Sequence, residues 1–179
     1  GISAIVTIMQ YFSNETMLKS FVIWTMGSLG NLTSEQLHVL IICTAAGLFL
    51  SVLSTKMLNA LLLGDNYASS MGLRVKYART VIFLCTSILA GSVTAFCGPI
   101  GFIGIAVPHI ARMLFRTSDH RILIPGSVLA GGAIMIGSDI LSQLPGSGHI
   151  LPVNAVASFI GVPVVIWIIM RNRKFSGMY

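Results

Sequence analysis

Residues 98–121, GPIGFIGIAVPHIARMLFRTSDHR, decide the fold class of this chain. Their apolar part continues an uncharged run that begins at Thr80, and their last ten positions bring four charges, Arg112, Arg116, Asp119 and Arg121. A long apolar run that stops at arginines is typical of a segment that crosses a membrane and ends at its surface. Because Gly98 and Pro99 interrupt the run, the pattern predicts two spans, roughly 75–96 and 100–115.

The overall composition agrees with a membrane protein. Hydrophobic residues make up 55% of the 179 residues and charged residues only 9%, far from the balance of a soluble domain. The net charge of +6 does not indicate nucleic-acid binding, because the basic residues stand in short groups between apolar runs and are not interleaved with aromatic residues. Cys43, Cys85 and Cys97 lie in apolar segments without a CxxC pair, so we expect neither disulfides nor a zinc site.

The remaining spans follow from the spacing of the charged residues. Twenty uncharged residues separate Glu35 from Lys56, and two further apolar runs cover 122–143 and 150–170. Residues 2–12 are apolar but too short for the ~20 residues that a span needs. The sequence therefore predicts an all-α, polytopic transmembrane bundle with about five full spans and a truncated N-terminal one.

Basic residues assign a side to each loop. Lysines and arginines in short loops favour the cytoplasmic side of a membrane. With these spans only Lys19 falls on the outer side, and ten of the 11 basic residues share the other. The ten are Lys56, Arg74, Lys76, Arg79, Arg112, Arg116, Arg121, Arg171, Arg173 and Lys174. The C-terminus is therefore predicted to be cytoplasmic, and the segments near 13–36, 97–99 and 144–149 to face outward.

Four motifs resemble one known family. They are WTMGSL at 24–29, LLLGDNYASSMGL at 61–73 followed by Arg79, GPIGFIGIAVPHIAR at 98–112 followed by SDHR, and LPVNAVASFIGVP at 151–163. In this order they resemble the FecCD-type permeases, the membrane subunits of bacterial ABC importers for iron–siderophore complexes, haem and vitamin B12. The chain is similar to roughly the C-terminal half of such a permease, so residues 1–179 are expected to be one partial transmembrane permease domain that lacks its N-terminal helices.

The resemblance also implies a function and partners. Such a permease lies in the bacterial inner membrane as a homodimer, is powered by separate cytoplasmic ABC ATPase subunits, and receives its cargo from a periplasmic substrate-binding protein. It carries an iron chelate (siderophore or haem) or cobalamin, and the sequence does not choose among these cargoes. We expect no catalytic residues, no resident metal and no cofactor in the chain itself.

The segment LLLGDNYASSMGL is the first candidate site. Asp65 is expected to cap a short helix through Met71, with Gly72 ending that helix. The leucines before it need a partner that removes them from water. The resemblance assigns coupling to the ATPase to this cytoplasmic segment, and an ordinary interfacial loop is the alternative. The residues concerned are Leu61, Leu62, Leu63, Gly64, Asp65, Ala68, Met71 and Gly72.

The glycine-rich stretch is the second candidate site. Gly98 and Pro99 are expected to end a helix, while Gly101 and Gly104 leave a helix face without side chains, which suits either close helix packing or a translocation pathway. Pro108 removes a helical hydrogen bond and can kink the span.

The residues that follow are expected to anchor the cytoplasmic end of this span, with Asp119 capping the next helix. The anchoring residues are His109, Arg112, Arg116 and Arg121.

Polar residues at the predicted outer ends are candidates for docking of the binding protein. They are Gln143 and His149, with His38 and Asp139 on the same predicted side. Members of the family commonly have arginine at position 143, so docking chemistry is where this chain departs from the resemblance. The chain also has Ile150, Asn154 and Ala157 where glutamate, glycine and threonine are common in the family.

An ion-coupled secondary transporter is the alternative function. It would need ionisable residues near the middle of the membrane and helices broken there, whereas the charges of this chain collect at the ends of the predicted spans. An intramembrane enzyme would need paired Ser/His or Asp/Asp residues or an HExxH motif at membrane depth. The sequence contains none of these within the predicted spans.

Overall fold

A computed structural model describes residues 2–30, 32–143 and 151–176. Over these ranges the chain forms nine α-helices and no strand, which confirms the all-α prediction. The helices are α1 (Ile2–Tyr11), α2 (Glu15–Met26), α3 (Ser34–Leu53), α4 (Thr55–Leu61), α5 (Asp65–Ser70), α6 (Val75–Cys97), α7 (Ile103–Phe115), α8 (His120–Gln143) and α9 (Val153–Ser176).

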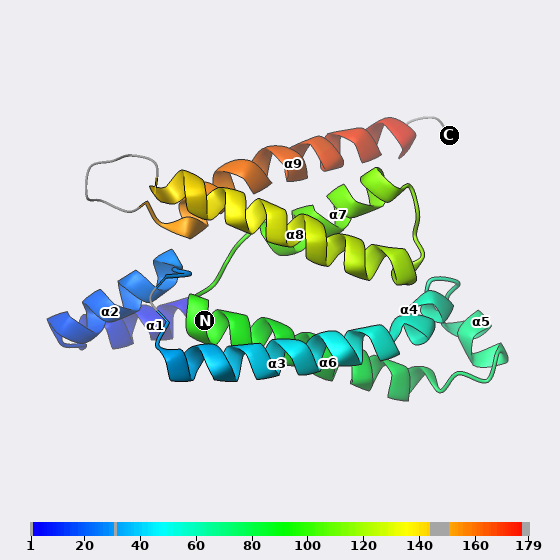
Figure 1. Cartoon of the computed structure of the whole chain (residues 1–179), viewed down its shortest axis with the longest axis horizontal. Helices are drawn as coiled ribbons and strands as arrows, with labels where there is room; N and C mark the ends of the chain where they lie inside the picture. Colours follow the sequence, from blue (N-terminus) through cyan, green and yellow to red (C-terminus); the bar gives the residue numbers. More distant parts are fainter. Residues whose placement is uncertain (1, 31, 144–150, 177–179) are drawn as a thin grey trace.

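The long helices lie in two layers (Figure 1). One layer pairs α3 with α6, and the other packs α7, α8 and α9 against one another. The short helices α4 and α5 stand together at one end of the molecule, while α1 and α2 lie at the opposite end. Contacts of α4 with α8 and of α2 with α9 join the layers at the two ends.

Small residues let the helices approach within each layer. Between α3 and α6, the side chain of Leu89 lies directly over Gly47, and the Cys85 thiol donates to the Gly47 carbonyl at 3.1 Å. Between α7 and α8, the ring of Phe115 rests on Gly126. The buried apolar residues are mostly alanine, cysteine and valine. Close approach of backbones, rather than large interlocking side chains, therefore holds these helices together, as is common in membrane bundles.

Among the helices of the described ranges, three are long and apolar enough to cross a membrane, judged by length and composition: α3, α6 and α8. The prediction of a helix break at Gly98 is confirmed, since α6 ends at Cys97 and Gly98 has φ +80°. The helix after it differs from the expectation. It begins only at Ile103 and has 13 residues, because residues 98–102 are not helical and Phe102, at φ +63°, cannot continue a helix.

The predicted last span is shifted in the same way. α9 begins at Val153 rather than at 150, so the uncharged part of this helix covers 153–170. The turn-rich segment 144–149 and Ile150 lie outside the described residues. The segment 13–36, predicted to face outward, contains the short helix α2, which ends at Gly27 with φ +73°.

Candidate functional site

The segment 61–72 forms a helix, a tight turn and a second short helix. Gly64, at φ +95°, turns the chain after α4, and α5 runs from Asp65 to Ser70. Two hydrogen bonds end α5, from Gly72 N to Ser69 O at 2.9 Å and from Leu73 N to Ala68 O at 3.0 Å. This pair of bonds around a glycine at φ +83° is a Schellman motif. Gly72 therefore ends the helix as predicted.

The predicted role of Asp65 as helix cap is wrong. Gly64 occupies the cap position and Asp65 is the first helical residue. Its carboxylate instead accepts a hydrogen bond from Arg79 Nη2 at 2.6 Å, forming an ion pair with the first turns of α6. The two side chains are 50% and 64% exposed, so the pair fixes the orientation of α5 more than it stabilises the fold.

An apolar surface stands on the outside of this segment. Ala68 is fully buried beneath α5, whereas four large apolar side chains are between 49% and 64% exposed. These are Leu62, Leu63, Tyr67 and Met71, and we call them the end patch. Tyr67 was missed by the sequence analysis, although its spacing of four residues from Met71, which caps α5, is the signal that places these two side chains on one helical face.

The anchoring residues lie at the same end of the two-layer structure as the end patch. Arg112 is exposed in the last turn of α7, and Arg116 ends that helix in the left-handed region at φ +50°. Arg121 is exposed in the first turn of α8. His109 is half-buried one turn before Arg112. All four therefore stand in the last two turns of α7 or the first turn of α8, which agrees with the predicted grouping of basic residues.

The start of α8 is capped by two side chains. Asp119 Oδ1 accepts from Arg121 N at 2.9 Å, which confirms the predicted cap. Asn59 of α4 completes it, because its Nδ2 donates to Asp119 Oδ1 at 2.6 Å and its Oδ1 accepts from His120 N at 2.9 Å. These hydrogen bonds from Arg121 and Asn59 hold the pKa of the Asp119 carboxyl below its ordinary value. Sequence reasoning missed Asn59, whose partners lie 60 and 61 positions away.

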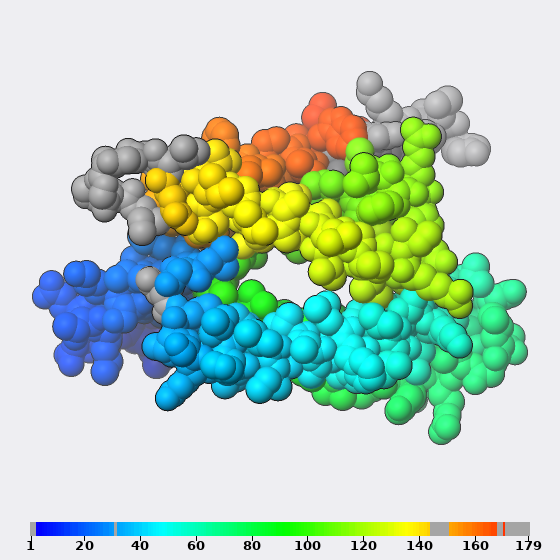
Figure 2. Space-filling view, viewed as in Figure 1, coloured from blue at the N-terminus to red at the C-terminus, as the bar shows by residue number. Residues whose placement is uncertain are grey.

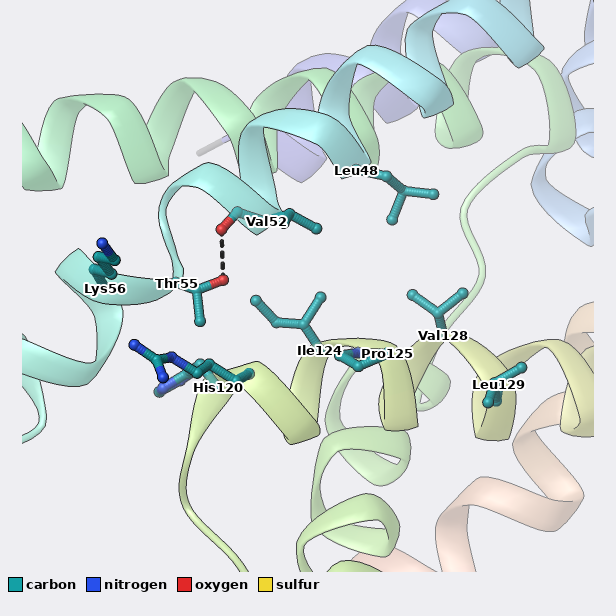
Figure 3. Close-up of a pocket in the computed structure, with 10 residues that line it drawn as sticks. Leu48, Val52, Thr55, Lys56, His120, Ile124, Pro125, Val128 and Leu129 are labelled. Atoms are coloured by element: carbon teal, nitrogen blue, oxygen red, sulfur yellow. Dashed lines mark hydrogen bonds between the residues drawn. The ribbon is translucent and has the colours of Figure 1, made fainter.

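A groove of about 690 Å³ separates the layers next to this cap. Figure 2 shows the opening between the cyan surface of α3 and the yellow-green surface of α8. Apolar side chains from both helices point into the groove in Figure 3, while Lys56, His120 and Arg121 line its polar end. The apolar lining consists of Leu48, Val52, Ile124, Pro125, Val128 and Leu129.

Three of the sequence motifs meet at the opposite end of the molecule. Ser28 N donates to Cys97 O at 3.0 Å, and Trp24 Nε1 donates to Ala95 O at 3.3 Å, which joins the end of α2 to the end of α6. Asn154 of α9 accepts from Gly101 N through its Oδ1 at 3.0 Å. Asn154 thus holds the non-helical segment 98–102, a role that its position in the sequence did not reveal.

The five residues predicted for pathway or packing divide into different environments. A Cβ at Gly98 would overlap the Trp24 carbonyl oxygen, so this glycine serves close backbone packing. Gly101 contacts only the Asn154 amide within 4 Å of a Cβ position, and Gly104 has nothing within that distance. Pro99 is half-buried in the non-helical segment, and Pro108 lies inside α7.

The C-terminal ends of α2 and α8 and the start of α9 line a second cavity of about 290 Å³. Gln143 and Asp139 line it, and Gln143 Nε2 donates to Asp139 Oδ2 at 2.9 Å. Asp139 therefore has a partner within this chain. The other predicted docking residue, His149, lies outside the described residues. Within the described ranges, no three histidine, cysteine or acidic side chains gather closely enough to hold a metal ion.

Comparisons with known proteins identify the family. A sequence model of the FecCD transport family matches residues 1–171. The chain belongs to this family. Among curated FecCD relatives, the hemin transport system permease protein HmuU of Yersinia pestis is 36% identical over 171 residues. The vitamin B12 import system permease protein BtuC of Klebsiella pneumoniae is also 36% identical over 171 residues, and that of Vibrio cholerae is 34% identical.

These FecCD relatives are about twice as long as the chain. The alignments with HmuU and the Klebsiella BtuC cover 96% of the chain but 51% of each relative. A solved structure of a metal-chelate type ABC transporter in an inward-facing conformation matches with a TM-score of 0.84 and 29% identity. The match covers 94% of this chain and 56% of the chain in that structure. The FecCD fold thus extends over nearly all of this sequence.

Proposed function

We propose that this chain forms the C-terminal half of the membrane-spanning permease subunit of a bacterial ABC importer for an iron chelate, haem or cobalamin. The end patch carries the proposal: exposed apolar side chains stand beyond the long helices, at the end where the basic residues collect. Such a surface is costly in water and suits a protein partner. The similarity to haem and vitamin B12 import permeases supports an ABC ATPase as that partner.

In this proposal the chain performs no covalent chemistry. The ATPase subunits bind the end patch, and nucleotide favours one of the two conformations of the permease because it binds that conformation more tightly. The segment 61–72 passes the change to the long helices. The outer cavity near Gln143 faces the periplasmic side and meets the binding protein, and the complete permease is a homodimer in the inner membrane.

The acidic residues do not favour an ion-coupled secondary transporter. All five lie within the described ranges, and each stands in a loop or in the end turns of a helix. They are Glu15, Glu35, Asp65, Asp119 and Asp139. Asp139, the one closest to membrane depth, is four residues from the end of α8 and bonded to Gln143. A proton or sodium relay needs carboxylates deeper in the bundle.

Reconstitution of the complete permease tests the proposal. We expect the permease that contains this sequence to purify with an ABC ATPase encoded beside it. In proteoliposomes with the binding protein, it should take up labelled haemin, a labelled ferric siderophore or labelled cobalamin only when ATP is supplied. Uptake that needs a proton or sodium gradient and no ATP would contradict the proposal and favour the secondary transporter.

A further inference from the structure

Asn59 links the two layers through three close polar contacts. Its amide donates to Asp119 and accepts from the backbone of His120, and its Oδ1 also lies 2.8 Å from His120 Nδ1. Asn59 stands on α4, which continues from α3, whereas Asp119 and His120 begin α8 in the other layer. We call this set of contacts the Asn59 bridge.

The bridge depends on the chemistry of an amide. The first N–H groups of a helix have no hydrogen-bond partners within the helix. In α8, Asp119 accepts from the backbone N–H of Arg121, and Asn59 accepts from that of His120. The Asn59 side chain also donates to the Asp119 carboxylate. Alanine at position 59 offers neither group, and aspartate would place a second carboxylate against Asp119. An amide provides the required donor and acceptor together.

The bridge lies next to the segment proposed to contact the ATPase. Asn59 precedes Leu61 by two positions on the same short helix, and α5 is tied in turn to α6 by the ion pair of Asp65 with Arg79. Segment 61–72 is therefore connected to the first layer by the chain itself and by this ion pair. Next to this segment, α4 packs against α8 in the second layer, and the Asn59 bridge supplies side-chain hydrogen bonds at that contact.

We propose that Asn59 is a positioning residue that makes α8 follow segment 61–72 when the ATPase subunits move it. The inference rests on the proposed function, because it requires that segment 61–72 receives the movement. Since α8 forms one wall of the groove between the layers, its displacement relative to α3 would change the width of that groove.

Two fluorescent reporters on the complete permease, assembled with its ATPase in nanodiscs, test this inference. Ser70→Cys on α5 reports the movement of the coupling segment, and Ala133→Cys reports the movement of α8; both positions are exposed. The native cysteines are replaced by alanine. A non-hydrolysable ATP analogue should change both signals. With Asn59→Ala the signal at position 70 should persist, and most of the change at position 133 should be lost.

Matched variants separate positioning from stability. Asn14→Ala removes an exposed asparagine that makes no capping bond, and it should leave both signals intact. Asp119→Asn keeps an acceptor for Asn59 and for Arg121 N, so it should retain most of the response at position 133. Asn59→Asp keeps the side-chain volume and should lose that response. It provides the decisive measurement if Asn59→Ala does not assemble.

The outcomes distinguish the two proposals. An unchanged response at position 133 in Asn59→Ala or Asn59→Asp overturns the role of Asn59 and leaves the coupling assignment standing. An equal loss in Asn14→Ala also overturns it. If position 70 of the otherwise native complex does not respond to nucleotide while the complex hydrolyses ATP, the coupling assignment is wrong, and the role of Asn59 is wrong with it.

Discussion

Gly98 combines two constraints at one residue. Its backbone has φ +80°, which side chains disfavour, and a Cβ there would overlap the Trp24 carbonyl oxygen. We therefore expect Gly98→Ala to destabilise the permease, by about 1–3 kcal/mol from the backbone conformation alone. Gly104→Ala is the matched control from the same motif, since a Cβ at Gly104 has open space. Thermal unfolding midpoints in detergent measure the difference, and equal midpoints for the two variants would contradict this account.

Single residues were predictable from the sequence where their partners are local. Asp119 caps a helix that starts at the next residue, so the motif SDHR was sufficient to place it. The sequence predicted a capping role for Asp65 in the same manner, yet Asp65 is the first residue of α5 and pairs with Arg79, fourteen positions away, while Gly64 takes the cap. Capping and ion pairing were both compatible with the local sequence around Asp65, and its role depends on a partner from another helix. The roles of Asn59 and Asn154 were not predicted for the same reason, because their partners also lie far away in the sequence.

At the scale of the element, the ion pair between α5 and α6 gives a prediction about coupling. Asp65→Arg places two arginines together and should turn α5 away from α6, which lowers both ATPase binding and ATP-driven uptake. The stability of the permease should hardly change, because exposed ion pairs contribute about 0–1 kcal/mol. Co-purification of the ATPase and uptake in proteoliposomes measure the effect.

A charge exchange and a matched reversal control this experiment. Asp65→Arg combined with Arg79→Asp restores an ion pair and should recover part of the coupling. Glu15 is also the first residue of a helix, at the other end of the molecule, and Glu15→Arg should leave ATPase binding unchanged. If Asp65→Arg binds the ATPase and transports as the native permease does, the coupling role of this element is wrong.

Helix positions were largely predictable, and helix ends were not. Runs without charge located α3, α6 and α8 to within a few residues, because a span requires about 20 apolar residues in sequence. The shortness of α7 was not foreseen, because the sequence placed the helix break at Gly98 and Pro99, and the next helix was expected to begin at 100. The actual conformation of residues 98–102 depends on Gly98, on Phe102 and on the amide of Asn154.

At the scale of the whole molecule, many large apolar side chains are exposed and the buried apolar residues are few and small. The chain also spans about half the length of its relatives. We therefore expect that this chain by itself, even with the ATPase present, transports nothing, whereas the complete permease does. ATP-dependent uptake of haemin or cobalamin by proteoliposomes containing only this chain and the ATPase would contradict that expectation.

The arrangement of the helices in two layers was beyond sequence reasoning. Charge placement predicted which helix ends lie together, and the structure agrees: the basic loops gather at one end, with Lys19 at the other. It did not predict that α3 and α6 would stand apart from α7, α8 and α9 across a groove. The layers form because close contacts at small residues pair particular helices: Gly47 of α3 receives Leu89 of α6, and Gly126 of α8 receives Phe115 of α7.

The short α7 has a consequence for the surrounding lipid. Its 13 residues rise about 20 Å, about 10 Å less than the hydrocarbon thickness of a typical bilayer. Residues 98–102, which precede α7, are not helical, and such backbone cannot face acyl chains where it enters the hydrocarbon. Neighbouring helices must keep fatty acyl groups away from it, or the bilayer must be thinner beside α7. A thicker membrane of longer acyl chains would then strain this corner of the permease first.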